Sequence, residues 1–211
     1  MKHIRNLVFD LDGTLYPETD EIKQRFLDKM VEYFRDEMGI IADDYMVLIA
    51  EWRKKHGSCT PAVAEYGGDP KAYMNYAGDV DVSDVEYNDE LKKKLERLSH
   101  RKIIYTNGSM KHTIDVLERL RLNGMFDELY TIGEADYVPK PNMASYKMLL
   151  EKYNLNPDET VLIEDRVKNL QPAKELGIKT VLITDGGEKD VSFCDYIVKD
   201  IIEAVDLFLE Q

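Results

Sequence analysis

Short apolar runs recur along the chain, and helical patterns separate them. The runs are IRNLVF (4–9), KIIYT (102–106), TVLIE (160–164), KTVLIT (179–184) and the shorter YIV (196–198). Several lack polar alternation, as expected for strands that are covered on both faces of a parallel sheet. Apolar residues at helical spacing occupy 110–122, 142–153 and 167–176. Strands that alternate with helices predict an α/β fold with a Rossmann-like, doubly wound parallel sheet.

Residues 18–98 break this alternation, because they contain no convincing strand. Helical patterns occupy 21–38, 43–57, 69–76 and 88–98, and the first of them is long and amphipathic. We therefore expect an all-helical domain over 17–98, inserted into an α/β core formed by 1–16 and 99–211.

The overall charge limits the ligands that this protein can bind. The 211 residues carry a formal net charge of −13, which argues against binding to nucleic-acid phosphates. No apolar run approaches the roughly 20 residues that span a bilayer, and the N-terminus lacks the apolar core of a signal peptide. Cys59 and Cys194 are far apart in sequence and favour a reduced compartment, although a disulfide remains open. We expect a cytoplasmic protein without a membrane or nucleic-acid partner; the sequence leaves its oligomeric state open.

Two acidic residues, Asp10 and Asp12, directly follow the first apolar run. Ligand sites of open α/β sheets lie beyond the carboxyl ends of the strands, and residues i and i+2 point to the same side. Two close carboxylates raise one pKa or recruit a cation, and Mg²⁺ prefers such hard oxygen ligands. The alternatives are a turn rich in Asp and Gly, or a calcium loop. A calcium loop needs Gly at its sixth position, where this chain has Leu15.

Polar residues also follow the other predicted strands. Thr106 and Asn107 stand at the start of a predicted helix, where exposed N–H groups favour an anion. Lys140 lies between two prolines and could serve as a point charge for a phosphate. Glu164 and Asp165 end a further strand, as Asp10 and Asp12 do. Each feature alone could be a helix cap or a solvated loop, but all lie at the same expected edge of the sheet.

With these motifs, the chain resembles the haloacid dehalogenase-like (HAD) hydrolase superfamily. FDLDGT, YTNGS, the lysine of PKP, and Glu164–Asp165 are similar to its four motifs in order and spacing, and the helical insert is similar to the cap of its subclass I. The segments FDLDGTLYP, YGGDPKAYMNYAGDVDVSD and IIYTNGSMKHTIDVLERL are similar to the pyrimidine 5′-nucleotidase group. The chain has Gly78, Glu164 and Arg166 where that group tends to have His, Asp and Ser.

The resemblance implies a Mg²⁺-dependent phosphomonoester hydrolase that acts through an aspartyl-phosphate. Asp10 is the expected nucleophile and Asp12 the expected acid and base. Asp10, the backbone carbonyl of Asp12 and Asp165 are the expected ligands of Mg²⁺. The expected phosphate-binding residues are Thr106, Asn107 and Lys140.

The implied substrate is a small phosphomonoester, with a nucleoside monophosphate as the main expectation. The alternatives are a sugar-phosphate phosphatase or phosphomutase on the same fold, or a non-catalytic phosphate-binding protein. Substrate selection is expected in the cap, where Tyr16, Trp52 and Tyr66 are candidates; for Trp52 we favour a place in the hydrophobic core.

Overall fold

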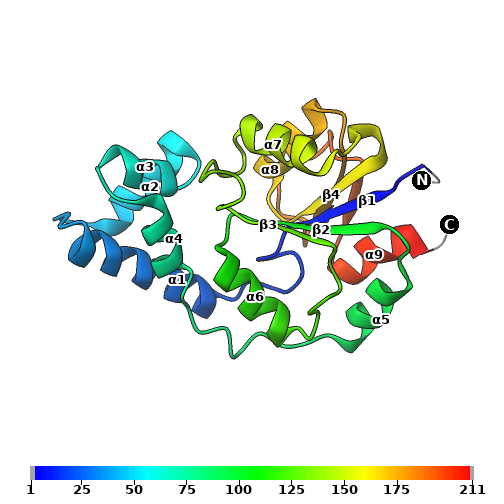
Figure 1. Cartoon of the computed structure of the whole chain (residues 1–211), viewed down its shortest axis with the longest axis horizontal. Coiled ribbons are helices and arrows are strands. Elements are labelled where there is room, and N and C mark those ends of the chain that lie inside the picture. Colours follow the sequence, from blue (N-terminus) through cyan, green and yellow to red (C-terminus); the bar gives the residue numbers. More distant parts are fainter. Residues whose placement is uncertain (1–2, 210–211) are drawn as a thin grey trace.

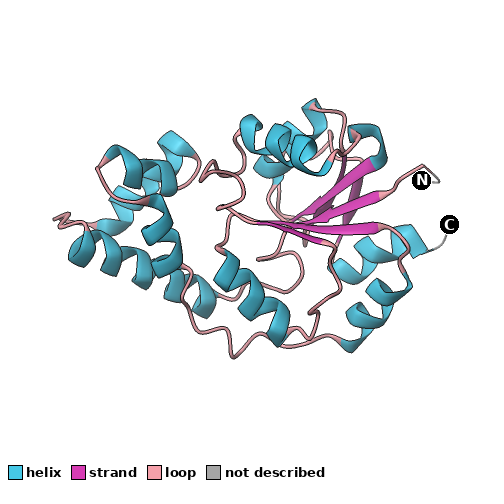
Figure 2. Cartoon of the chain, viewed as in Figure 1, coloured by secondary structure: helices cyan, strands magenta, loops and turns pink. Residues whose placement is uncertain are grey.

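The computed structural model describes residues 3–209 and contains a six-stranded, parallel sheet with helices on both faces (Figures 1 and 2). The strand order is β3-β2-β1-β4-β5-β6. The strands are β1 (Asn6–Phe9), β2 (Arg101–Tyr105), β3 (Glu128–Tyr130), β4 (Thr160–Glu164), β5 (Lys179–Ile183) and β6 (Tyr196–Val198). The chain therefore has the predicted α/β fold with a doubly wound sheet.

Neighbouring residues of the central strands face opposite sides of the sheet. On one face, Leu7 and Phe9 pack with α5 (Asp89–Arg97), α6 (Met110–Arg119) and α9 (Ile201–Leu209). On the other face, Val8 packs with α7 (Met143–Tyr153) and α8 (Val167–Glu175). A short 3₁₀-helix, Pro157–Glu159, leads into β4. Both faces of β1 are thus buried, which explains why its sequence is apolar throughout.

The strand β3 was not predicted from the sequence. It has only three residues, ELY, and begins with a charged residue. Its pairing with β2, where Ile103 lies opposite Glu128, is a long-range contact that no local pattern reveals.

Four helices form the separate group at the left of Figure 1, next to the carboxyl ends of the strands. They are α1 (Asp20–Glu32), which continues as a π-helix over Tyr33–Glu37, α2 (Tyr45–His56), α3 (Thr60–Glu65) and α4 (Pro70–Ala77). Side-chain caps fix where these helices begin, as Thr19 does for α1 and Asp44 for α2. The short α3 was not predicted, because six residues are too few to show a periodic pattern.

Aromatic side chains form the core of these four helices. Trp52 is buried among them and packs edge-on against Phe34, with ring centroids 4.9 Å apart. This agrees with the prediction that Trp52 belongs to a hydrophobic core. Tyr66 is exposed and lies against Trp52.

The helix α5 was expected within the helical insert, but it packs on the sheet. Its buried leucines, Leu91 and Leu95, belong to the same cluster as β1 and α9, and Lys94 pairs with Asp206 of α9 at 2.5 Å. The helical insert expected over 17–98 therefore includes a helix that covers the core. We propose that the cap comprises α1 to α4, and that the chain has returned to the core by α5.

Across residues 3–209, no helix combines the length and the apolar character that crossing a membrane requires.

Candidate active site

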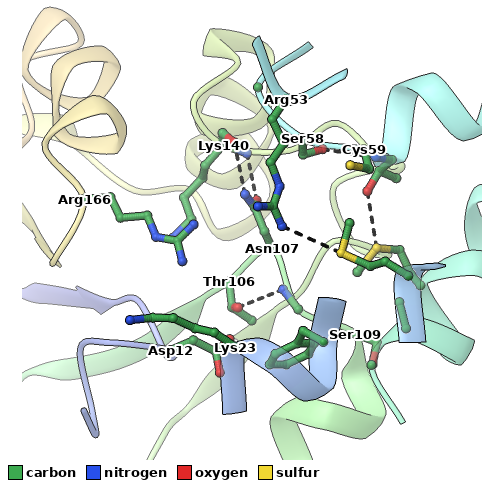
Figure 3. A pocket seen from close by; sticks show the side chains of 18 of the residues that line it. Asp12, Lys23, Arg53, Ser58, Cys59, Thr106, Asn107, Ser109, Lys140 and Arg166 are labelled. Atoms are coloured by element: carbon green, nitrogen blue, oxygen red, sulfur yellow. Dashed lines mark hydrogen bonds between the residues drawn. The ribbon is translucent and has the colours of Figure 1, made fainter. Parts of the chain in front are cut away.

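The carboxyl ends of the three central strands place the predicted motifs at one edge of the sheet. The strand β1 lies between β2 and β4, with Phe9 opposite both Ile104 and Ile163. Asp10 follows β1, Thr106 follows β2 and Glu164 ends β4. A cavity of about 440 Å³ opens between this edge and the cap (Figure 3). Asp10, Asp12, Thr106, Asn107 and Lys140 all line it.

Three carboxylates gather at the base of this edge. One oxygen each of Asp10, Glu164 and Asp165 lies within 4.8 Å of the others. Burial and the charge of Glu164 raise the pKa of Asp10 to about 7, although Lys140 acts in the opposite direction. Burial and the same Glu164 charge raise the pKa of Asp165 to about 8. The cluster therefore favours the approach of a further positive charge.

The ammonium of Lys140 neutralises part of this cluster. Its Nζ lies 2.6 Å from Asp10 Oδ1 and 2.8 Å from Glu164 Oε2, and it donates to the backbone oxygen of Tyr105 at 2.8 Å. Burial would lower the pKa of Lys140, but the carboxylates of Asp10 and Glu164 outweigh this effect and raise it. Lys140 is therefore a fully buried cation directed at Asp10, not a solvated loop lysine.

The side chain of Asn107 holds the backbone of Lys140 in place. Its Oδ1 accepts from Lys140 N at 2.8 Å, and its Nδ2 donates to Lys140 O at 3.0 Å (Figure 3). Both ends of the amide are thus engaged. Thr106 Oγ1 accepts from Gly108 N at 2.9 Å, which orders the turn that leads into α6.

Two residues outside the predicted motifs contact Asp12. Tyr16 donates its hydroxyl to Asp12 Oδ1 at 2.5 Å, and His112 Nε2 lies 2.7 Å from the same oxygen. Burial raises the pKa of Asp12, but the imidazole of His112 and the two hydrogen bonds outweigh it and lower that pKa. Asp12 is therefore held as a carboxylate, with Oδ1 fixed by its two partners.

His112 was not predicted as a site residue from the sequence, and Tyr16 was considered only as a candidate for substrate selection. The signal for His112 was its position three residues after Ser109, which caps α6 and accepts from His112 N. This spacing puts His112 in the first turn of α6, close to the strand ends. Burial lowers the pKa of His112, but the nearby Asp12 outweighs this and raises it.

The turn after Asp12 depends on a glycine. Gly13 has φ +85°, and a Cβ at this position would lie 2.5 Å from Asp165 Oδ2. Only glycine combines this backbone conformation with the close approach of Asp165. A Cβ at Gly78 would lie 2.5 Å from Ser109 Oγ, so this position has no room for the histidine of the nucleotidase group.

The helix-cap and calcium-loop alternatives do not describe these residues. The residue that precedes α8 is Arg166, which makes no side-chain capping bond, so Asp165 does not cap this helix. Glu21, the twelfth position of the hypothetical calcium loop, lies in the first turn of α1 and is not part of the acidic cluster. Cys59 and Cys194 are both free thiols.

A family model supplies an independent comparison. The model, described as haloacid dehalogenase-like hydrolase, matches residues 7–183. The chain belongs to the haloacid dehalogenase-like hydrolases. The matched range runs from β1 to β5 and contains every residue of the acidic cluster.

Relatives of this HAD hydrolase include named phosphatases. It is 27% identical to a glyceraldehyde 3-phosphate phosphatase of Methanocaldococcus jannaschii, over 97% of this chain and 96% of that protein. It is 24% identical to the pyrophosphatase PpaX of Bacillus mycoides, over 86% and 84% of the two chains. The crystal structure of a HAD phosphatase from Thermococcus onnurineus superimposes with a TM-score of 0.65, at 18% identity and 97% coverage of both chains, and shows the same fold.

Proposed function

We propose that this HAD hydrolase is a Mg²⁺-dependent phosphomonoesterase with Asp10 as its nucleophile. The observation that carries the proposal is the position of Asp10. Its carboxylate lies at the base of the cavity, one oxygen bound by the buried Lys140 and the group close to Asp165. A carboxylate held in this way can attack phosphorus and form an aspartyl-phosphate.

The acidic cluster fits Mg²⁺ in the chemistry of its donors. All the side-chain donors are carboxylate oxygens, which suit a hard divalent ion. Both oxygens of Glu164 already accept hydrogen bonds, Oε2 from Lys140 and Asn169, and Oε1 from the backbone of Arg166. We therefore assign Asp10, Asp165 and the backbone carbonyl of Asp12 to the metal, and give Glu164 the task of positioning Lys140. When bound, the ion would neutralise charge on the phosphoryl group.

The other residues have distinct tasks in this proposal. The proton for the leaving alkoxide would pass through Asp12 from the protonated His112 beside it, and Asp12 would later take a proton from the attacking water. Its free oxygen, Oδ2, lies near Gly108, 3.7 Å from where a Cβ would stand. The hydroxyl of Thr106, the N–H groups of the following turn and Lys140 would stabilise the phosphoryl oxygens. Since its amide clamps Lys140, the side chain of Asn107 would act by position and only its backbone would meet phosphate.

The names of the relatives favour a sugar phosphate over the nucleoside monophosphate that the motifs suggested. The M. jannaschii protein, which the chain matches almost from end to end, is a glyceraldehyde 3-phosphate phosphatase. We therefore propose a small phosphorylated carbohydrate or sugar acid as substrate.

A phosphate-release assay tests this proposal. Purified protein would be given glyceraldehyde 3-phosphate, hexose phosphates, UMP, CMP and p-nitrophenyl phosphate, with Mg²⁺ or with EDTA. We expect Mg²⁺-dependent release of free phosphate, with sugar phosphates ahead of UMP and CMP. Transfer of phosphate to a second sugar without release would indicate a mutase instead.

The variant Asp10→Asn is the matched control, because it keeps the shape of the side chain and removes the nucleophilic carboxylate. We expect its turnover to fall at least about 10³-fold, since the nucleophile forms the covalent intermediate. Wild-type protein that releases no more phosphate than Asp10→Asn from any of these esters would overturn the proposal.

A further inference from the structure

The side chains that line the cavity include more cationic than acidic residues. Its cationic residues are Lys23, Arg53, Lys140, Arg166 and Lys168, and its acidic residues are Asp10, Asp12 and Glu18. In a chain with a net charge of −13, an excess of cations around one cavity suggests an anionic ligand.

Most of these cations have a partner within the protein. Lys140 pairs with Asp10, and Arg166 Nη2 lies 3.3 Å from Glu18 Oε2. Lys23 Nζ lies 3.5 Å from Asp20 Oδ1, on the same helix.

Arg53 and Lys168 differ from the other cations of the cavity. Among the described residues 3–209, neither forms an ion pair with a carboxylate. The Arg53 side chain donates to Met30 Sδ at 3.7 Å and also forms a hydrogen bond with Cys59, but neither partner is a carboxylate, so the guanidinium charge is available to an anionic ligand.

The two unpaired cations come from opposite sides of the cavity. Arg53 belongs to α2 of the cap, and Lys168 belongs to α8 of the core. Figure 3 shows the side chains of Arg53 and Arg166, which come from different elements, pointing toward the same space. Partial burial and the charges of Arg166 and Arg53 lower the pKa of Lys168, and the more weakly acting charge of Glu164 opposes them.

We propose that Arg53 and Lys168 form a second anion-binding subsite, and that the substrate is a phosphomonoester whose leaving group carries a carboxylate or a second phosphate. The inference rests on the proposed phosphomonoesterase activity and narrows its substrate class. A guanidinium binds carboxylate or phosphate oxygens through two parallel hydrogen bonds, and the ammonium of Lys168 adds a point charge. Since one cation lies on the cap and one on the core, the bound anion would also draw the cap toward the nucleophile.

The test compares esters that differ in one group. 3-Phosphoglycerate and glycerol 3-phosphate share a skeleton, and only the first has a carboxylate. Fructose 1,6-bisphosphate and fructose 6-phosphate also share a skeleton, and only the first has a second phosphate. We expect kcat/KM of the wild-type protein to be at least about tenfold higher for the doubly anionic member of one pair, and the pair that shows it identifies the second anion.

The variants Arg53→Gln and Lys168→Gln are expected to remove this preference. Each should lower kcat/KM for the preferred ester with two anionic groups about 10- to 100-fold, as for a lost charge-assisted hydrogen bond, and should lower it less for the counterpart that lacks the second anionic group. Lys54→Gln is the matched control, because Lys54 neighbours Arg53 on α2, is exposed and does not line the cavity. It should leave the ratio of the two kcat/KM values unchanged.

Binding provides a second measurement that does not depend on turnover. Calorimetric titration of the doubly anionic ester into Asp10→Asn, with and without Arg53→Gln, should show the same loss of affinity. Both mutated cations are exposed, so the variants are expected to fold.

Two failures can be told apart. The subsite would be overturned, and the phosphomonoesterase left intact, by either of two results. One is that, in both pairs, the ester without the second anionic group is hydrolysed at least as fast as the ester that has it. The other is that the ratio of the two kcat/KM values is unchanged in Arg53→Gln and Lys168→Gln. Absence of Mg²⁺-dependent hydrolysis of every ester would overturn the phosphomonoesterase itself, and the subsite with it.

Discussion

Replacing Lys140 by methionine removes a buried cation that contacts two members of the acidic cluster. Lys140 is 2% exposed, and its ammonium contacts Asp10 at 2.6 Å and Glu164 at 2.8 Å. Methionine has a similar length and fills the same volume, so the change deletes the charge without opening a cavity. The two buried carboxylates then face each other without a counter-charge.

The expected loss of stability is large. Removing one partner of a buried ion pair costs about 3–5 kcal/mol, because the remaining charge stays desolvated. For a chain of this length, each 1 kcal/mol lowers the melting temperature by about 2–4 °C, so the shift should be about 6–20 °C. Glu164 has no exposed surface and should take up a proton in the variant, because the charge of Lys140 is the strongest of the influences that lower its pKa against the effect of burial.

Urea denaturation in EDTA, followed by circular dichroism, measures this loss. Repeating the titration with Mg²⁺ adds a second expectation: the ion should stabilise Lys140→Met more than the wild-type protein, because it supplies positive charge to the same carboxylates. Lys199→Met is the control, since its ammonium pairs with Glu203 on the exposed surface and its loss should leave the midpoint unchanged. A variant that is as stable as the wild-type protein in EDTA would refute the reasoning.

Two further substitutions examine how the site is held together. His112→Gln removes the imidazole from Asp12, and kcat should fall about 10- to 100-fold for esters with poor leaving groups and less for p-nitrophenyl phosphate; an equal loss across a series of aryl and alkyl phosphates would contradict this role. Gly13→Ala should raise the Mg²⁺ concentration for half-maximal activity at least about tenfold, because the new Cβ would displace Asp165, whereas Gly124→Ala has similar backbone strain but nothing within 4 Å and should not. A normal Mg²⁺ dependence in Gly13→Ala would count against Asp165 as a ligand.

The sequence predicted the core because its signals were local. The apolar runs of β1 and β4 identify central strands without any knowledge of their partners, and parallel topology then brings the residues after each strand to one edge. Asp10, Thr106 and Asp165 could be grouped on this basis alone, whereas Lys140 does not directly follow a predicted strand. The length of the helical insert could not be predicted in this way, because the leucines of α5 fit a cap helix and a core helix equally well. Our proposal that α5 belongs to the core rests on their packing with α9 and β1.

The contacts of Asp12 with His112 and of Lys140 with Asn107 could not be predicted, because the spacing of residues in the sequence does not determine how close they lie in the fold. His112 reads as an ordinary residue in the first turn of α6, and only the placement of that turn beside the β1 loop brings it within 2.7 Å of Asp12. The contact of Asn107 with phosphate stays a prediction for its backbone, whereas the bonds of its side chain to the backbone of Lys140 were not predicted. Sequence motifs thus identified where the charges gather, and the structure shows which of them are already paired.

This pairing gives the cavity two regions of opposite character. At its base, Asp10 lies close to Glu164 and Asp165, and burial together with the charge of Glu164 raises the pKa of Asp10 to about 7 and that of Asp165 to about 8. On its walls, Arg53 and Lys168 hold positive charge that no carboxylate of residues 3–209 offsets by an ion pair. An anionic ester alone would meet repulsion at the base, and a cation alone would leave the walls unpaired.

Mg²⁺ at the base together with an ester that carries two anionic groups relieves both regions at once, so we expect each ligand to strengthen the binding of the other. Calorimetric titration of 3-phosphoglycerate into Asp12→Asn, which keeps Asp10, Asp165 and the backbone carbonyl for the ion, with and without Mg²⁺ would measure that coupling, and equal affinity in the two conditions would argue against it.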